Sequence, residues 1–472
     1  MQRRSMKLGA AMIALLVAVS ACSSNKRGGS DTGPGDANTA GTSATNSAAA
    51  STVKFGTLDS PCGKGDAKGA TDQGVTDTAI SIGYGDDRGF AQSPGLNKEI
   101  GDAVKGMIQW CNDQGGINGR QIKGDFYDAA ITNVAPAIKG ACKNDFMLVG
   151  SGWASDETVE QQRVACNLPA VPAYAIGPDY ANGPMMYQGM PLPDDEQPAS
   201  SLFQMAKLFP DTKDAFGIME TNLPAIQVAG AKIKVAAAAA GFKVLDCGVS
   251  MNYTGEPNYT PFAQKFKQCG AKIIYLPTPG PEVNGLLTAM NQLGLHPKYL
   301  MQANGYSDAF AAWNTAGYGN DVYVQSAFEP LEDTSNPAVK TYEDAVQAVS
   351  GKTAPLGMQA TSSFLLWATA AKACGSTLTR QCVVNNLAKV HDWTAGGLQA
   401  QTDPGANVAT QCGLLLKLDG TKFVQAYPQQ AGQFDCNSSY AVKLPKATWF
   451  ASLNSDRIAT KFLTKNVITP QP

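Results

Sequence analysis

The chain has 472 residues, with 37 lysines and arginines against 39 aspartates and glutamates, and a formal net charge of -2. This balance, and the lack of any run rich in lysine and arginine, exclude the basic surface that a nucleic-acid partner requires. Roughly 400 residues remain after a leader and a linker are set aside, and a single hydrophobic core stops growing at roughly 250 to 300 residues. The length therefore predicts two lobes.

The first 21 residues predict export from the cytoplasm. Basic residues at the start are followed by an apolar run from position 8 to position 19, which is too short to cross a membrane and is typical of a secretory signal. Val19-Ser20-Ala21-Cys22 resembles the bacterial lipoprotein box, in which the cysteine receives a diacylglyceryl group. The resemblance implies that residues 1–21 are removed and that Cys22 anchors the protein to the outer face of the cell membrane.

A flexible tether is expected within residues 22–74. From position 23 to about position 52 the residues are almost all Ser, Gly, Ala, Thr, Asn and Asp, and none has a large apolar side chain. Such a segment cannot bury enough surface to become ordered, and a coil of this length spans roughly 30 Å.

Strand-like and helix-like patterns alternate from position 79 onward. Apolar alternation predicts a strand over 79–84, and an apolar stripe at Ile100, Val104, Met107, Ile108 and Cys111 predicts a helix over 97–114. Further strands are predicted at 121–127, 146–149, 168–171, 215–219, 242–249, 272–276, 299–302 and 322–325, and later helices at 337–349, 357–374 and 379–390. This alternation favours an α/β fold with parallel sheets covered by helices on both faces.

Breaks in the alternation suggest where the chain passes between lobes. The prolines and acidic residues of 188–197 interrupt the pattern, which favours a first crossing there, and two later crossings would complete a three-segment hinge. The expected divisions are 75–192 for the first part of lobe 1, 193–326 for lobe 2, 327–411 for the second part of lobe 1, and 412–472 for a hinge crossing, the completion of lobe 2 and the tail.

Five motifs stand out in this region: GDAVKGMIQWCNDQGGINGR at 101–120, Tyr127-Asp128, DFMLVG at 145–150, Pro281-Glu282 and Gly294-Leu295. Together they resemble the type I periplasmic binding proteins, in particular the leucine/isoleucine/valine-binding family of ABC transporters, over positions 80 to 427. The resemblance implies two Rossmann-like lobes with a ligand between them, no reaction and no cofactor, and delivery of the ligand to an ABC permease by a monomer.

The ligand site is expected where the strands end, because open α/β sheets bind ligands beyond the carboxyl ends of their strands. Charged groups, hydroxyls, amides and aromatic rings follow the predicted strands, and this mixture suits a small polar solute. The candidate residues are Asp86, Asp87, Arg88, Ser151, Trp153, Ser155 and Tyr174 in the first lobe and Asn222, Thr278, Asn304 and Tyr306 in the second.

The identity of the ligand stays open. Amino-acid binders of the family carry a carboxylate where this chain has Asn304, and an amide cannot supply that charge to a ligand ammonium. Either Asp86 or Asp87 replaces the carboxylate, or the ligand is a neutral amide, a polyol, or an aromatic acid paired with Arg88.

Eleven cysteines in an exported chain are typical of disulfides, and ten remain when Cys22 is set aside. No CxxC pair and no H-E-x-x-H motif occurs, so no metal site is predicted. The sequence does not fix the pairing. Proximity along the chain favours Cys62 with Cys111, Cys142 with Cys166, Cys247 with Cys269, Cys374 with Cys382, and Cys412 with Cys436.

Two other functions share some of these features. Gly305-Tyr306-Ser307-Asp308-Ala309 nearly matches the nucleophile elbow of serine hydrolases, and His391 lies downstream, although Ser307 fits equally well as a helix N-cap. A ligand-sensing receptor component would use the same two-lobed clamp as a transport protein.

Overall fold

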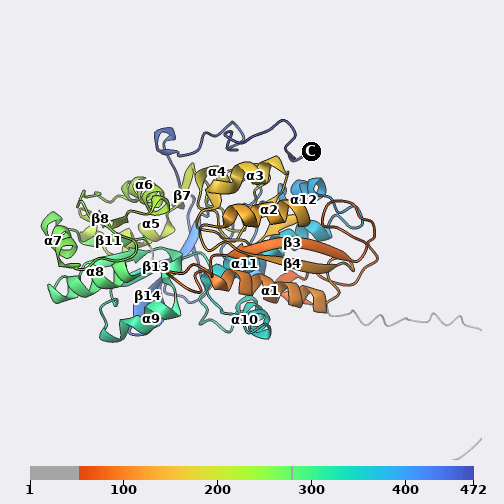
Figure 1. Cartoon of the computed structure of the whole chain (residues 1–472). Helices are drawn as coiled ribbons and strands as arrows, with labels where there is room; N and C mark the ends of the chain where they lie inside the picture. Colours follow the sequence, from red (N-terminus) through yellow and green to blue (C-terminus); the bar gives the residue numbers. More distant parts are fainter. Residues whose placement is uncertain (1–52, 278–279, 472) are drawn as a thin grey trace, which may run out of the picture. The chain divides into compact units, whose positions relative to one another are not determined.

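The computed structural model describes residues 53–277 and 280–471 (Figure 1). Within these ranges the chain builds two separate sheets with parallel cores, one of four strands and one of seven. No helix of the described ranges is long and apolar enough to span a bilayer. The predicted signal peptide, Cys22 and Thr278 lie outside the described residues.

The first lobe is built on the four-stranded sheet, whose strands run parallel in the order β4-β3-β5-β6. Helices cover both faces, and Figure 1 shows α1 and α2 on opposite sides of β3 and β4. The strands are β3 (Ala79–Asp86), β4 (Gln121–Asp128), β5 (Met147–Val149) and β6 (Ala170–Val171), and the helices are α1 (Lys98–Asp113), α2 (Val134–Asn144), α3 (Glu160–Ala165), α4 (Pro178–Ala181), α10 (Pro337–Ala348), α11 (Pro355–Lys372) and α12 (Arg380–Leu387).

Helix α1 shows why the apolar spacing was informative. Ile100, Val104, Met107 and Cys111 are fully buried along one side of the helix, as the stripe predicted. Burial of each large apolar side chain contributes about 1.5 to 3 kcal/mol, so this face holds the helix against the sheet. The glycines that follow the helix adopt positive φ angles, 112° at Gly115 and 76° at Gly116, and turn the chain into β4.

The second lobe is built on the seven-stranded sheet. Strands β8, β11, β12 and β13 are parallel, and β14 and β15 then add to its edge in antiparallel fashion. The strands are β8 (Phe216–Ile218), β11 (Ile273–Leu276), β12 (Lys298–Met301), β13 (Val322–Ser326), β14 (Cys412–Asp419), β15 (Lys422–Tyr427) and β16 (Asp435–Cys436), and the helices are α5 (Ser200–Leu208), α6 (Pro224–Ala239), α7 (Thr260–Cys269), α8 (Pro281–Gln292) and α9 (Asp308–Trp313).

The predicted strand at 242–249 is wrong. Only Val244 pairs there, through a single bridge to Phe216, and a two-residue strand, β10 (Ser250–Met251), follows it. The positive φ of 58° at Gly248 interrupts the extended backbone that a continuous strand would need.

Folded structure is present before position 74, where the expected tether was to end. A short hairpin joins β1 (Lys54–Phe55) to β2 (Leu58–Asp59), and the Phe55 side chain is fully buried in the core of the first lobe. Part of the segment expected to be tether therefore packs as folded structure.

The peptide expected to make the first crossing pairs with the far end of the chain. Strand β7 (Glu196–Pro198) lies antiparallel to β17 (Ala441–Lys443). Helix α5 comes directly after β7 and packs in a cluster with the second sheet. This junction therefore joins a segment near the middle of the chain to one near its C-terminus.

The described residues contain five disulfides, and they are the five pairs that proximity favoured. Cys62–Cys111 ties the first hairpin region to α1, and Cys412–Cys436 joins β14 to β16.

Candidate functional site

The order of strands in the first sheet creates a topological switch point. From β3 the chain passes to one side to form β4 and then returns to the other side of β3 to form β5. In open α/β sheets the crevice at such a point is where ligands bind. The loop that follows β5 is joined to the end of β3 here, because the Gly152 N–H donates to the Gly85 carbonyl at 3.0 Å.

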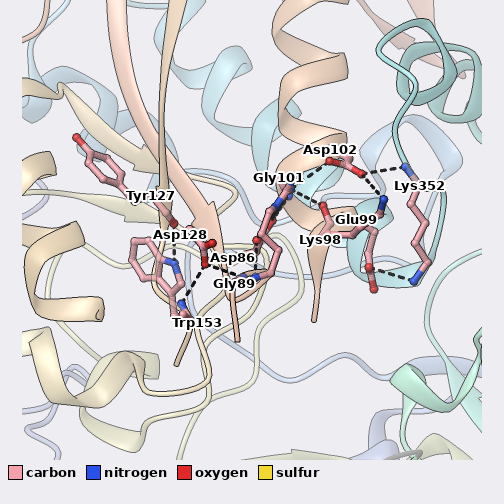
Figure 2. Close-up of polar contacts among 12 residues, drawn as sticks. Asp86, Gly89, Lys98, Glu99, Gly101, Asp102, Tyr127, Asp128, Trp153 and Lys352 are labelled. Atoms are coloured by element: carbon pink, nitrogen blue, oxygen red, sulfur yellow. Dashed lines mark hydrogen bonds and ion pairs between the residues drawn. The ribbon is translucent and has the colours of Figure 1, made fainter. Parts of the chain in front are cut away.

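Gly85 lets an indole ring come close to the end of β3. A Cβ at this position would lie 1.9 Å from the Tyr127 carbonyl oxygen and 3.1 Å from Nε1 of Trp153. Trp153 is 1% exposed, and its Nε1 donates to the same carbonyl at 3.4 Å (Figure 2). The loop after β5 is therefore seated on the last residues of β3 and β4.

Tyr174, in the loop after β6, packs against the loop after β5. Its ring lies against Gly152, where an added Cβ would come within 2.7 Å of a ring carbon. Its hydroxyl accepts a hydrogen bond from Nδ2 of Asn97 at 3.1 Å. Burial raises the pKa of Tyr174 well above its ordinary value, so the hydroxyl keeps its proton and can donate. Asn97 was not predicted as a site residue: it precedes α1, but its side chain makes no capping bond there and reaches Tyr174 instead.

The side chains of Asp86 and Arg88 form an ion pair with each other. Asp86 is fully buried, and its carboxylate accepts from Nε of Arg88 at 2.9 Å, from Nη2 at 2.7 Å and from the Gly101 N–H at 3.1 Å. Burial raises the pKa of Asp86, and the neighbouring guanidinium opposes that rise. Arg88 also lies 3.1 Å from Asp102 and donates to the Lys98 carbonyl at 2.7 Å.

This network continues from α1 to the loop before α11, as Figure 2 shows. The Lys352 N–H donates to Asp102 at 3.0 Å, and the Lys352 ammonium lies 3.3 Å from the Glu99 carboxylate. The charges at the end of β3 thus fix the start of α1 against a later segment of the same lobe.

Asp87 holds two loops together. It is fully buried, and its two oxygens accept from the backbone N–H groups of Ile131 at 2.7 Å and Ala154 at 2.8 Å. Ile131 has a φ of 66°, which is rare for a β-branched residue, and this bond compensates for the strained turn. Burial raises the pKa of Asp87, while the two backbone donors oppose the rise.

The remaining first-lobe candidates carry hydroxyls. Ser151 is 1% exposed, and its Oγ has no hydrogen-bond partner within the described residues. Ser155 is half-buried before the short 3-10 helix Asp156–Val159, and its side chain makes no capping bond there.

The second-lobe candidates differ in their exposure and in the hydrogen bonds that they already make. Asn222 is exposed, and its Oδ1 accepts from the Tyr253 N–H at 3.1 Å. The Oδ1 of Asn304, at the end of β12, is buried without a hydrogen-bond partner in the part of the chain that the structure describes. The Tyr306 hydroxyl donates to the Glu332 carboxylate and accepts from the Leu331 N–H at 2.8 Å.

The structure brings most of the first-lobe candidates together and leaves the second-lobe candidates apart from them. Short contacts link the loops after β3, β4, β5 and β6 into one rim that carries Asp86, Asp87, Arg88, Trp153 and Tyr174. Among the described residues, no hydrogen bond or ion pair connects this rim to Asn222, Asn304 or Tyr306. The roles of all these residues in ligand binding stay predictions.

The hydrolase-like residues do not form a triad in the described parts of the chain. The Ser307 hydroxyl accepts from the Phe310 N–H at 3.3 Å and so caps α9. His391 pairs with Asp403 at 2.8 Å, and no hydrogen bond joins either of them to Ser307. The N-cap interpretation of Ser307 is confirmed.

Comparison with known proteins gives one family. Residues 79–422 match the model of a family described as periplasmic binding protein. This range includes all of the first sheet and most strands of the second. No curated protein sequence matches the chain.

Several solved structures share the fold. A fatty acid ABC transporter substrate-binding protein from Thermomonospora curvata superposes with a TM-score of 0.65 at 16% identity, over 80% of this chain and 97% of its own. A branched-chain amino acid ABC transporter protein from Thermus thermophilus with bound valine gives 0.62 at 13% identity, over 77% and 98%. LivJ from Streptococcus pneumoniae, in complex with isoleucine, gives 0.57 at 16% identity, over 74% and 100%.

Proposed function

Because the chain belongs to the periplasmic binding protein family, we propose that it captures a small polar solute between its two lobes and releases it unchanged. The observation that carries this proposal is the family match over residues 79–422. The solute would shift an open ensemble toward a closed one, since only a closed form contacts it from both lobes.

The ligand we propose is uncharged and polar, such as an amide or a polyol. The charges of Asp86 and Arg88 are already paired, and each oxygen of Asp87 accepts from a backbone N–H. A ligand ammonium or carboxylate would therefore have to displace contacts that hold the rim together. Among the described residues, the Oγ of Ser151 and the Oδ1 of Asn304 are buried without a hydrogen-bond partner, which favours a ligand that supplies hydrogen bonds.

A screen of candidate solutes tests this directly. Binding raises the free energy of unfolding by RT ln(1 + [L]/Kd), about 2.7 kcal/mol at a hundred times Kd, so a thermal-shift assay detects it. Amides and polyols should raise the melting temperature, and calorimetry should then give one site per chain. A screen in which only free amino acids or fatty acids bind would overturn the ligand class while keeping the binding function.

Delivery to an ABC permease and anchoring through a lipid on Cys22 complete the proposal. The structural relatives named above include a fatty acid ABC transporter substrate-binding protein, which supports a permease as the partner. Cys22→Ala should abolish labelling with radioactive palmitate and move the protein from the detergent phase to the aqueous phase. Retention of the variant in the detergent phase would reject the anchor.

The same protein should be inert as a hydrolase. The Ser307 hydroxyl caps a helix, which supports a structural role. Activated esters incubated with the purified protein should therefore hydrolyse at the background rate. Esterase activity that disappears in Ser307→Ala would contradict the binding-only function.

A further inference from the structure

The last segment of the chain crosses the first lobe as an irregular stretch, with one short 3-10 helix at Lys446–Thr448. Residues 444–471, here called the strap, lie beyond the family match that ends at position 422. Figure 1 shows this blue segment passing α4 and α3 toward α12. Its Ala459 N–H donates to the Asn182 carbonyl after α4, and its Thr469 carbonyl accepts from Gln381 of α12 at 2.7 Å.

The strap is fastened to the crossing peptide through Asp194. This residue is fully buried, and its Oδ2 accepts from the backbone N–H groups of Phe450 and Ala451, both at 2.7 Å. Its own N–H donates to Oδ1 of Asn182 in the first lobe at 2.6 Å. One buried carboxylate therefore binds two successive amides of the strap.

A second fastening lies one residue further along. The Arg457 guanidinium makes a two-pronged pair with Asp195, with Nε at 2.6 Å from one oxygen and Nη2 at 2.7 Å from the other. Nη2 is also 3.5 Å from the Glu196 carboxylate, and the Leu444 N–H donates to the Asp195 carbonyl at 2.8 Å. Paired donors of this kind fix orientation as well as position.

The same peptide contacts the second lobe through a buried lysine. The Nζ of Lys232, on α6, lies 3.0 Å from Oδ1 of Asp194 and donates to the Pro193 carbonyl at 3.3 Å. Lys232 is 6% exposed, and the next residue of α6, Ile233, packs in the cluster of the second sheet. Asp194, which belongs to the crossing peptide, thus contacts the strap and both lobes.

We propose that the strap braces the hinge, an inference that rests on the proposed clamp. Hinges move through changes of φ and ψ at a few connecting residues. At the first crossing, Asp194, Asp195 and Glu196 are each held by a side chain or an amide from outside the crossing. The brace narrows the range of lobe arrangements in the ligand-free protein, which raises the fraction able to close on a ligand. Arg457 and Lys232 are positioning residues in this account.

The test measures lobe motion without a ligand. Spin labels replace the exposed Lys105 on α1 and Lys267 on α7, and electron paramagnetic resonance gives the distribution of distances between the lobes. Arg457→Met should broaden this distribution. Arg457→Lys keeps the positive charge but cannot make the two-pronged pair with Asp195, so it should broaden the distribution less. The control is Lys465→Met, because Lys465 is an exposed strap residue with no ion pair among the described residues.

Binding and folding readouts separate a brace from simple stabilisation. With a solute found by the thermal-shift screen, Arg457→Met should raise Kd by about 3- to 10-fold, since the competent fraction falls. Amide exchange at Phe450 and Ala451 should quicken in this variant while core strands stay protected. A distance distribution as narrow as that of Lys465→Met would overturn the brace. A screen without any bound solute would reject the clamp but leave the distance result standing.

Discussion

Asp86 and Arg88 are two residues apart at the end of β3, and their side chains form a two-pronged ion pair with N···O distances of 2.9 Å and 2.7 Å. Open α/β sheets bind ligands beyond this edge, yet here the charges point at each other and at the start of α1. The pair therefore stabilises the rim of the proposed site, and we expect the ligand contacts to come from neutral side chains beside it.

Breaking this pair should destabilise the fold. Arg88→Met leaves the buried Asp86 carboxylate without its cation, and loss of one partner from a buried pair costs about 3 to 5 kcal/mol. Because the Arg88 side chain is 31% exposed, we expect the lower end of that range, measured by urea denaturation. Lys340→Met removes an exposed pair with Asp344 and should cost less than about 1 kcal/mol. Equal losses in the two variants would contradict the structural role of Asp86.

Stability should depend on pH through Asp145. Burial raises the pKa of this carboxyl to about 8, with Asp125 as a further cause, and Tyr127 donates to it at 2.8 Å. The folded protein keeps the proton where the unfolded chain has lost it, so this stabilisation is complete below about pH 4 and disappears as pH rises toward 8. The expected decline is about 1 kcal/mol per pH unit.

Asp145→Asn removes this titration and should make the decline in the free energy of unfolding between pH 5 and pH 8 shallower. Part of the slope should remain, because burial raises the pKa of Asp156, Glu282 and Glu329 to about 7 as well. Asp344→Asn, at an exposed position, serves as the control and should keep the slope of the unaltered protein. Parallel profiles for all three proteins would show that Asp145 does not hold a proton in the folded state.

Each disulfide should contribute to the free energy of unfolding according to the length of the loop that it closes. Cys62 and Cys111 are 49 residues apart, whereas Cys374 and Cys382 are 8 apart. Loop-closure entropy gives about 4 kcal/mol for the first bridge and about 2.5 kcal/mol for the second. Double replacement by alanine, followed by chemical denaturation, measures each contribution. A larger loss at Cys374–Cys382 would show that local packing outweighs chain entropy.

Asn304, in the second lobe, should strengthen ligand binding by accepting a hydrogen bond. Its buried Oδ1 lacks a partner within the described residues, so a ligand donor would satisfy it. Asn304→Ala should weaken binding of the identified solute about 10-fold, as expected for one hydrogen bond of about 1.4 kcal/mol. Gln292→Ala truncates an exposed amide on α8 and is the matched control in calorimetry. Unchanged affinity in Asn304→Ala would remove this residue from the site.

The sequence predicted most of the fold because hydrophobic periodicity and chain order are local signals. The stripe on α1 located that helix to within a residue at each end, and proximity paired all ten cysteines of the folded region as the structure has them. The failed strand at 242–249 has a local cause as well, since the apolar pattern there does not register the left-handed backbone at Gly248.

The candidate site was harder to predict because charge pairing depends on side-chain geometry. Asp86 and Arg88 fit a ligand-binding pattern in the sequence, and only their mutual distances show that they are occupied. Asn97 and Arg457 were missed for a related reason: each contacts a residue far away in the chain, Tyr174 and Asp195 respectively. No spacing rule connects such pairs.

The central claim is that a solute closes two lobes. Small-angle X-ray scattering of the full protein, with and without the solute identified by the thermal-shift screen, tests it most directly. We expect the radius of gyration to fall on saturation, because the closed form is more compact. An identical radius of gyration in the free and saturated protein would contradict the clamp.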